Sequence, residues 1–479
     1  MLTLINTNRM LPLIGPVGLD YVAGSAEQAG IDVEVLDLAL SQNPAEALKK
    51  YFSSQQPQLI GLSFRNVDDC FWPSADWFVP GLKNTVDSIR SLSSAPIVIG
   101  GVGFSVFPDQ IVEYTGADFG IHGDGETAIT SLFRQLRGAK NFTKVPGLLW
   151  RKDGKIISNP PNWPDRISLT TARNFIDNIS YFKQGGQCGV ETKRGCDRKC
   201  IYCADPLSKG TKLRLRSPYE VVDEIQALLS QGIDVLHFCD SELNVPRSHC
   251  YAICEEISRR SLGGRIRWYA YMSPVPFDDD LANLMAKAGC AGIDFTGDSA
   301  CPAMLKTYRQ QHSKQHIADA VRLCRQNGIA VMIDLLLGGP GETPQTLTET
   351  IDFIKKINPD CAGAALGIRI YPGTAMGELV TLDLKQGKDF NIRRKYTGPI
   401  DFFKPTFYIS SALGEKPAKL VRDLISGDRR FFAPADEVDF KASENDAPSG
   451  YNYNENLPLV KAIREGARGA YWDILRKIR

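Results

Sequence analysis

Apolar runs alternate with helix-length amphipathic stretches over the first third of the chain. The runs have the length and mainly apolar character of strands that are buried in a parallel sheet. They occupy residues 2–5, 31–38, 58–64, 95–100 and 117–121. The intervening stretches, such as residues 18–29 and 44–52, are long enough for the crossover helices that join parallel strands. We therefore predict an α/β fold whose N-terminal domain, residues 1–145, is a doubly wound, Rossmann-like parallel sheet.

A second alternation of apolar runs and amphipathic helices follows over residues 186–385. Its predicted strands are residues 235–238, 266–271, 292–296, 330–337 and 363–370. Repeated strand and helix units of this size predict a full or partial (β/α) barrel. Residues 146–185 are polar and interrupted by Pro160, Pro161 and Pro164, which predicts a linker over the surface.

The pattern weakens after residue 385. The segment 436–456 is rich in Asp, Glu, Asn and Ser, and an amphipathic stretch begins near Pro458. We expect residues 386–479 to form a small, loop-rich C-terminal cap that ends in a helix.

Composition adds few constraints to this picture. The chain has 479 residues, of which 43% are hydrophobic and 23% charged, with a formal net charge of +1. These values are typical of a multidomain globular protein, and they do not call for a nucleic-acid or anionic-membrane partner. No apolar run has the eighteen or so residues of a membrane span, and the N-terminus lacks a signal-peptide pattern. We therefore expect a cytoplasmic protein whose 12 cysteines are reduced.

Three cysteines are concentrated in one short loop. Cys196, Cys200 and Cys203 are spaced to bind three irons of a [4Fe-4S] cluster and so to serve as the catalytic metal ligands. The fourth iron would then be open to the amino and carboxylate groups of S-adenosylmethionine (SAM). The alternative is a zinc site, which would need a fourth ligand. The nearby Asp197 and Asp205 and the distant His237 are poor substitutes for the paired cysteines that zinc usually takes.

The motif CxxxCxΦC, with Tyr202 as the aromatic Φ, resembles the signature of the radical SAM superfamily. The resemblance implies that polar and glycine-rich segments at the barrel strand ends contact SAM. Asp240, Ser241 and Glu242 would hold the amino group, and Asp298 and Ser299 the ribose or carboxylate. The remaining implied SAM contacts are Tyr202, Gly338, Gly339, Pro340 and Arg369. Each segment also has an ordinary interpretation, as a turn or a helix N-cap.

The N-terminal domain is similar to the cobalamin-binding domain that precedes the barrel in cobalamin (B12)-dependent radical SAM enzymes. Small residues at strand ends would let the backbone approach a large flat ring. The implied cobalamin contacts are Ser63, Arg65, Gly100, Gly101, Gly123, Gly125 and Glu126. No histidine precedes His122, so the DxHxxG motif that ligates cobalt elsewhere is missing.

Arg65 has two interpretations. As a cation that does not ligate cobalt, it could face the lower side of the corrin and favour a low-coordinate metal. Alternatively, it could form an ion pair with Asp68 or Asp69.

Two other families are disfavoured. Methylthiotransferases hold a second cluster through three cysteines in the N-terminal domain, whereas residues 1–150 contain only Cys70. A dinucleotide-binding domain would carry GxGxxG after the first strand, and this chain does not.

The resemblance implies reductive cleavage of SAM to methionine and a 5'-deoxyadenosyl radical, hydrogen abstraction from a small-molecule substrate, and methylation of a substrate carbon with cobalamin. An electron donor such as flavodoxin or ferredoxin would be the partner. Two alternatives stay open. The same cofactors could serve a ring contraction, cyclisation or oxidation, or the chain could be a non-catalytic cobalamin or iron-sulfur sensor. Trp268, Tyr269 and Tyr271 could line the substrate pocket or pack in the core.

Overall fold

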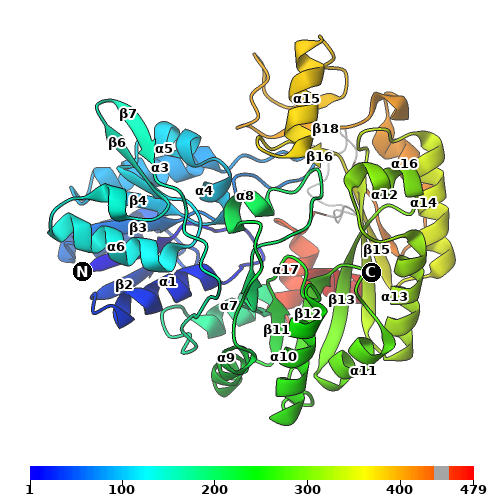
Figure 1. Cartoon of the computed structure of the whole chain (residues 1–479), viewed down its shortest axis with the longest axis horizontal. Helices are drawn as coiled ribbons and strands as arrows, with labels where there is room; N and C mark the ends of the chain where they lie inside the picture. The colour runs from blue at the N-terminus through cyan, green and yellow to red at the C-terminus, as the bar shows by residue number, and fades with distance from the viewer. Residues whose placement is uncertain (436–451) are drawn as a thin grey trace.

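The computed structural model describes residues 1–435 and 452–479. Most of the acidic segment predicted as a loop, residues 436–451, lies outside the described residues. Two large sheets stand side by side, the N-terminal one in blue and cyan and the second in green and yellow (Figure 1). Among the described helices, none is both long and apolar enough to cross a bilayer.

The N-terminal sheet confirms the five predicted strands. They are β1 (Leu2–Asn6), β2 (Val33–Asp37), β3 (Leu59–Ser63), β4 (Ile97–Gly100) and β5 (Phe119–Ile121), which pair in parallel in the order β2-β1-β3-β4-β5. Alternate residues of one strand pack on opposite faces: Leu4 contacts the cluster that includes helices α1 (Val17–Gln28) and α6 (Gly125–Arg137), and Ile5 faces α2 (Pro44–Ser54) and α3 (Val79–Arg90). The sheet is therefore doubly wound, as predicted.

The strand order reverses between β1 and β3, so the flanking connections leave toward opposite faces at this point. In such sheets a crevice opens at the carboxyl ends of the strands on either side of the reversal. The fold thus places a ligand-binding crevice beyond Asn6 and Ser63.

A hairpin extends this sheet into the range predicted as linker. Strands β6 (Leu148–Lys152) and β7 (Lys155–Ser158) add antiparallel to β5. Leu148, Leu149 and Trp150 form a short, buried apolar run, and Gly154 makes the turn at a φ of 75°. A mixed edge of this kind is common on parallel sheets, but the run is too short to identify a strand by its pattern.

The second sheet is an open, partial barrel of parallel strands. Its order is β19-β15-β14-β13-β12-β11-β8, so β8 and β19 are its edges in the described part of the chain. The strands are β8 (Cys188–Val190), β11 (Val235–Phe238), β12 (Arg267–Met272), β13 (Cys290–Asp298), β14 (Ala330–Leu337), β15 (Cys361–Leu366) and β19 (Phe431–Phe432).

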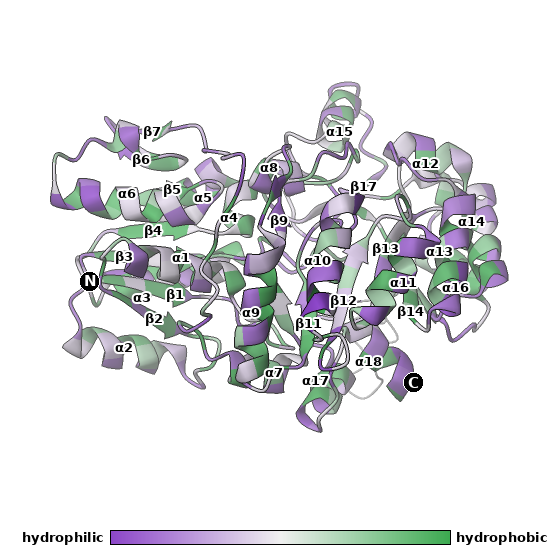
Figure 2. Cartoon of the chain, turned by 60° about the horizontal axis from the view of Figure 1, so that its bottom comes forward, coloured by the Kyte–Doolittle hydropathy of each residue, from purple (hydrophilic) through white to green (hydrophobic). Residues whose placement is uncertain are grey.

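Amphipathic helices cover the convex side of the barrel, with their hydrophilic faces outward (Figure 2). They are α9 (Pro218–Ser230), α10 (Arg247–Arg259), α11 (Asp279–Lys287), α13 (Lys314–Gln326), α14 (Pro344–Ile357) and α16 (Pro417–Ile425). Trp268, Ile293 and Phe295 belong to the cluster packed against these helices. By strand alternation, Tyr269, Tyr271 and Asp294 face the barrel interior.

The last two helices fill the amino-terminal end of the barrel. Leu459 of α17 (Leu457–Arg464) and Trp472 of α18 (Tyr471–Ile478) share a buried cluster with Tyr269 and Met332. The Tyr269 hydroxyl donates to Asp473 Oδ2 at 2.7 Å. The predicted C-terminal helix is thus present, followed by a second one, and both close the barrel at the end opposite the strands' carboxyl termini.

A second part of the C-terminal region forms a lobe at the top of Figure 1. It contains α15 (Ala375–Lys385) and a small antiparallel sheet of β16 (Ile368–Arg369), β18 (Thr406–Tyr408) and β17 (Ile392–Arg394).

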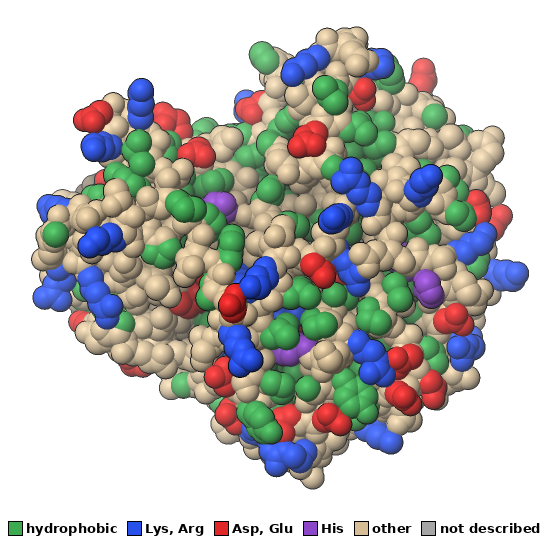
Figure 3. Space-filling model, viewed as in Figure 1, with side chains coloured by type: hydrophobic (Ala, Val, Ile, Leu, Met, Phe, Trp, Pro, Cys, Tyr) green, Lys and Arg blue, Asp and Glu red, His purple; other side chains and the backbone are tan. Residues whose placement is uncertain are grey.

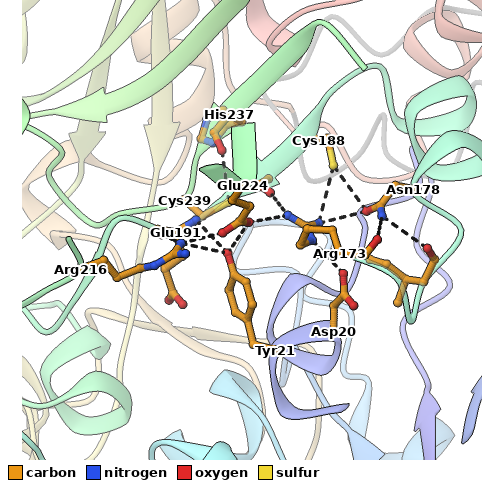
Figure 4. Close-up of polar contacts among 12 residues, drawn as sticks. Asp20, Tyr21, Arg173, Asn178, Cys188, Glu191, Arg216, Glu224, His237 and Cys239 are labelled. Atoms are coloured by element: carbon orange, nitrogen blue, oxygen red, sulfur yellow. Dashed lines mark hydrogen bonds and ion pairs between the residues drawn. The ribbon is translucent and has the colours of Figure 1, made fainter. Parts of the chain in front are cut away.

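A buried polar network joins the two sheets (Figure 4). Arg173, within the predicted surface linker, has a fully buried side chain that donates from Nε to Asp20 Oδ2 of α1 and from a terminal nitrogen to Glu224 Oε1 of α9, both at 2.8 Å. The Tyr21 hydroxyl donates to the same Glu224 oxygen at 2.7 Å. Buried charges of opposite sign that are hydrogen-bonded in this way fix one relative position of α1 and α9.

Candidate functional site

The cysteine loop follows β9 (Lys193–Arg194) and precedes the short helix α8 (Asp205–Lys209). Gly195 begins the loop at a φ of 83°, and a Cβ there would lie 2.0 Å from the Lys212 carbonyl oxygen, so only glycine fits. The Cys196 amide donates to the Gly210 carbonyl at 3.1 Å, and the Ile201 amide donates to the Tyr308 carbonyl at 3.3 Å. These contacts hold the loop over the carboxyl ends of the barrel strands.

The three thiols lie close to one another. Burial raises the pKa of Cys200 to about 12 and the pKa of Cys203 well above its ordinary value, and the charges of the neighbouring cysteines add to both shifts. Burial also raises the pKa of Cys196. Among the described residues, no group of three or more histidine, cysteine or acidic side chains is arranged to hold a metal ion, the three thiols of this loop included. Three soft thiols fit a cluster, whose binding would displace their protons.

Glu242, just beyond β11, fits the predicted contact with an amino group. One carboxylate oxygen accepts a hydrogen bond from Thr296 Oγ1 at 2.7 Å, and the other, Oε2, is buried without a hydrogen-bond partner in the described residues. Burial raises the pKa of this carboxyl to about 7. An orphaned buried acceptor of this kind suits a ligand that brings its own donor.

Asp298 ends β13 beside the cysteine loop, at a φ of 55°. Its carboxylate accepts from the Tyr202 hydroxyl at 2.6 Å, and Gln310 Nε2 donates to Cys200 Sγ at 3.4 Å. Burial raises the pKa of Asp298 to about 6. Tyr202 packs edge-on against Tyr308, with ring centroids 5.8 Å apart. Asp298 and Tyr202 therefore stand at the cluster loop, where the resemblance puts SAM.

Other predicted SAM residues have partners within the protein. The Ser299 hydroxyl shares a hydrogen bond with Thr350 at 2.8 Å and accepts from the Cys301 amide, and Ser299 is fully buried. Asp240 accepts from the Thr192 and Lys193 amides. Both side chains serve here to fix the backbone.

Ser241, the remaining predicted residue beyond β11, donates its hydroxyl to Asp205 of α8. This contact links the cysteine loop's helix to the barrel.

The glycine turn after β14 is tightly packed. Gly338 has a φ of 89°, and a Cβ on Gly339 would lie 2.3 Å from the Tyr308 hydroxyl. Both glycines are buried, and the lack of a side chain on Gly339 lets the Tyr308 ring pack against the backbone of the turn.

Arg369, which is predicted to contact SAM, instead contacts the N-terminal domain. Its Nε donates to Asp68 Oδ2 at 2.8 Å, and its guanidinium lies 4.8 Å from the ring centroid of Tyr371. Because Arg369 is only 4% exposed and fully engaged, it fastens the C-terminal lobe to the N-terminal domain.

A cavity of about 400 Å³ opens at the predicted crevice of the N-terminal sheet. All of the predicted cobalamin residues line it: Ser63, Arg65, Gly100, Gly101, Gly123, Gly125 and Glu126. Gly101 has a φ of 107°, and a Cβ there would meet the Phe64 carbonyl at 2.6 Å. The wall of bare backbone at the strand ends fits a large flat ligand.

The barrel side of this cavity was not predicted. Glu191, Arg194, Lys209 and Cys239 line it together with the N-terminal residues. Arg194 forms a two-pronged ion pair with Glu126, at 2.7 and 2.9 Å. These residues reach the cavity only through docking of the two domains, for which the local sequence carries no signal.

The proposed ion pair of Arg65 with Asp68 or Asp69 is wrong. Asp68 pairs with Arg369, and Asp69 accepts from Ser74 and from the Asp76 amide. Arg65 is exposed in the cavity and donates to the Asn66 side chain at 2.8 Å.

The charge of Arg65 reaches the barrel. Together with burial, it lowers the pKa of the barrel residue His237. It also acts to lower the pKa of Cys239 and Tyr271, although burial has the larger effect and raises both. The crevice and the barrel mouth therefore face each other across Arg65.

Comparison with known proteins agrees with this geometry. The model of the B12 binding domain matches residues 6–133, and that of the radical SAM superfamily matches residues 190–354. Fold and site thus define a radical SAM enzyme with a cobalamin-binding domain in front of its barrel.

Individual relatives extend the match over the chain. The tryptophan 2-C-methyltransferase of Streptomyces laurentii is 32% identical over 433 residues, covering 77% of this chain and 72% of that protein. The structure of the radical SAM methyltransferase TsrM from Kitasatospora setae superposes with a TM-score of 0.89 at 28% identity, covering 100% of this chain and 99% of the other. OxsB, a cobalamin-dependent SAM radical enzyme, shares the fold at a TM-score of 0.72 and 19% identity, over 85% of this chain and 64% of its own. The chain belongs to the family of cobalamin-dependent radical SAM enzymes, whose cofactors are a [4Fe-4S] cluster, SAM and cobalamin, and the predicted class is confirmed.

Proposed function

We propose that this enzyme methylates a carbon atom of a small, aromatic, amino-acid-like substrate. The observation that carries the proposal is a cavity lined by residues of both domains, in which the crevice opens toward Cys239 on the barrel. The proposed substrate class is based on the tryptophan 2-C-methyltransferase that is 32% identical to this chain. Tyr271 at the barrel mouth, 37% exposed, supplies an aromatic face on which such a ring would pack.

Each group of residues has a role in this proposal. Cys196, Cys200 and Cys203 hold the cluster, and the orphaned oxygen of Glu242 accepts a hydrogen bond from the SAM amino group. Arg65 would present a cation to the corrin, and no histidine is among the described residues that line the cavity. When bound, cobalamin would carry the methyl group, and SAM would supply it.

The test is turnover of the anaerobically reconstituted protein with methyl-deuterated SAM and L-tryptophan. The proposal expects a deuteromethylated product and S-adenosylhomocysteine. Formation of 5'-deoxyadenosine with an unmethylated product would instead support the rearrangement or oxidation alternative. If neither nucleoside forms, the enzyme is not acting on SAM and the proposal fails.

We propose a flavodoxin or ferredoxin as the electron donor and the cytoplasm as the compartment. Acidic and basic side chains are interspersed on the face shown in Figure 3, which suits a small-molecule substrate better than a polyanion. Reduction of the cluster by purified flavodoxin, followed by its absorbance, tests the donor.

A further inference from the structure

His237 lies on the inner face of the barrel. It belongs to β11, on which its two neighbours Leu236 and Phe238 pack against the outer helices. Val235, two residues before it, instead shares the buried cluster of the helices that fill the barrel. Because successive side chains of a strand point to opposite faces, the imidazole of His237 faces the barrel interior.

The imidazole of His237 makes no hydrogen bond within the described part of the chain. The residue is linked to its surroundings through its backbone carbonyl, which accepts from Cys239 Sγ at 3.5 Å (Figure 4). The ring is half-buried, and no described group of metal-ligating side chains includes it. Half-buried polar atoms without a protein partner suit a ligand that brings one.

His237 and Tyr271 form a corner inside the barrel. Their ring centroids are 5.1 Å apart, and their planes meet at 64°. Tyr271 also points inward, since Ala270 and Met272 on either side of it pack outward, and it is 37% exposed. In this corner Tyr271 supplies an aromatic face and His237 supplies two polar nitrogen atoms.

The corner is on the side of the barrel that the cobalamin crevice faces. Cys239, two residues after His237, is exposed and lines the interdomain cavity. Arg65 lines the same cavity, and its charge acts on both His237 and Tyr271. A substrate in the corner would therefore lie between the barrel and the crevice.

The charge state of His237 limits what it can bind. Burial lowers its pKa to about 4, with the charge of Asp240 opposing this shift and that of Arg65 adding to it. The imidazole is therefore neutral near pH 7, with one nitrogen that donates and one that accepts. A neutral acceptor is a poor partner for an anion but a good one for the N–H of an aromatic ring, which only donates.

We propose that a ring nitrogen of His237 accepts a hydrogen bond from a ring N–H group of the substrate. This inference rests on the proposed function and deepens it, because it narrows the aromatic substrate to a heterocycle that carries an N–H group. The ring would pack on Tyr271, and His237 would be the residue that selects it.

The test measures binding to the holoenzyme loaded with cluster and cobalamin, in the presence of S-adenosylhomocysteine, which has no methyl group to donate. The two probes are L-tryptophan and 3-(3-benzothienyl)-L-alanine, in which sulfur replaces the ring N–H. Titration calorimetry gives the two dissociation constants, and their ratio reports the preference for the N–H group. Because no turnover occurs, the different reactivity of the two rings does not enter the ratio.

His237→Phe keeps a ring at this position and removes the acceptor. The preference for L-tryptophan should fall about 2- to 12-fold, the range expected for one net hydrogen bond between neutral groups. His237→Leu also lacks an acceptor and should give the same fall, so it replaces the first variant if that one does not fold. The matched control is His316→Phe, at an exposed histidine that caps α13, and it should leave the ratio unchanged.

The outcomes separate this inference from the proposed function. If the wild type methylates L-tryptophan but the His237 variants keep its preference, the inference alone is wrong. An equal loss of affinity for both probes, as a merely distorted corner would give, also contradicts it. If the wild type binds neither probe, the proposed substrate class is wrong and the inference fails with it.

Discussion

Arg369 and Asp68 form a buried ion pair at 2.8 Å that fastens the C-terminal lobe to the loop beyond β3 of the cobalamin domain. The two residues are 4% and 2% exposed. Arg369 also donates to the Phe402 carbonyl at 3.0 Å, so the pair is part of a hydrogen-bonded junction.

Removing one partner of this pair should be costly. In Arg369→Gln, Asp68 would remain buried without its cation, and the free energy of unfolding should fall by about 3 to 5 kcal/mol. Urea denaturation of the apoprotein measures the loss. Lys83→Gln, which breaks an exposed ion pair with Asp87, should cost about 0.5 kcal/mol or less. If Asp68→Asn in the Arg369→Gln background restores no stability, the ion pair is not the cause.

The cluster and the cobalamin should be separable by mutation. Cys200→Ser removes one of three thiol ligands, so iron content and the visible absorbance of the cluster should be largely lost. Cobalamin binding should persist, because the residues lining the crevice do not include the three cysteines. Iron analysis and cobalamin stoichiometry after gel filtration check both.

A matched control for this change is Cys70→Ser. Cys70 is hydrogen-bonded to the Tyr371 hydroxyl, and a serine hydroxyl can keep that bond. This variant should retain the full cluster. Loss of cobalamin together with iron in Cys200→Ser would show that the two sites depend on each other.

Several features could be predicted from the sequence because they are local. The strands of the first sheet are mainly apolar runs, and the small residues at the ends of β3, β4 and β5 line one cavity. Parallel strands place their carboxyl ends at the same edge of the sheet, so the local sequence pattern is enough to bring these residues together.

Features that depend on a distant partner could not be predicted. Arg369 has the right place for a SAM contact, yet its partner Asp68 lies far away in the chain. The barrel side of the crevice, including Arg194, arises from domain docking held by Arg173. On β12, Trp268 packs outward and Tyr271 inward, but every residue from Trp268 to Met272 is apolar or aromatic, so the pattern does not reveal which face is which.

The crevice floor should not tolerate a side chain at Gly101. In Gly101→Ala, the added Cβ would lie 2.6 Å from the Phe64 carbonyl oxygen, and the backbone φ of 107° is one that alanine rarely adopts. The floor must shift, so cobalamin affinity should fall about 5- to 150-fold, as a strain of about 1 to 3 kcal/mol implies. Cobalamin titration followed by absorbance measures the change.

Gly116→Ala is the control that distinguishes general backbone strain from a change in the shape of the crevice. Gly116 ends α5 (Pro108–Thr115) in the same domain at a φ of 71°, and an added Cβ would meet nothing within 4 Å. This variant should lose some stability but keep its affinity for cobalamin. Equal loss of affinity in both variants would mean that general destabilisation, and not the crevice floor, is responsible.

Glu342 should make stability depend on pH in a defined direction. The side chain is fully buried beside the glycine turn, and burial raises its pKa to about 7, against an ordinary value near 4.5. The folded state therefore binds more protons than the unfolded state between about pH 4.5 and 7, so this group's contribution to stability falls as pH rises through that window. Glu342→Gln cannot ionise and keeps an acceptor for the Gly338 amide. Relative to wild type it should be gradually more stable from pH 5 to pH 8, by at most about 3 kcal/mol. Urea denaturation of both apoproteins across this range gives the difference directly. A difference that does not change with pH would show that Glu342 titrates normally in the folded protein.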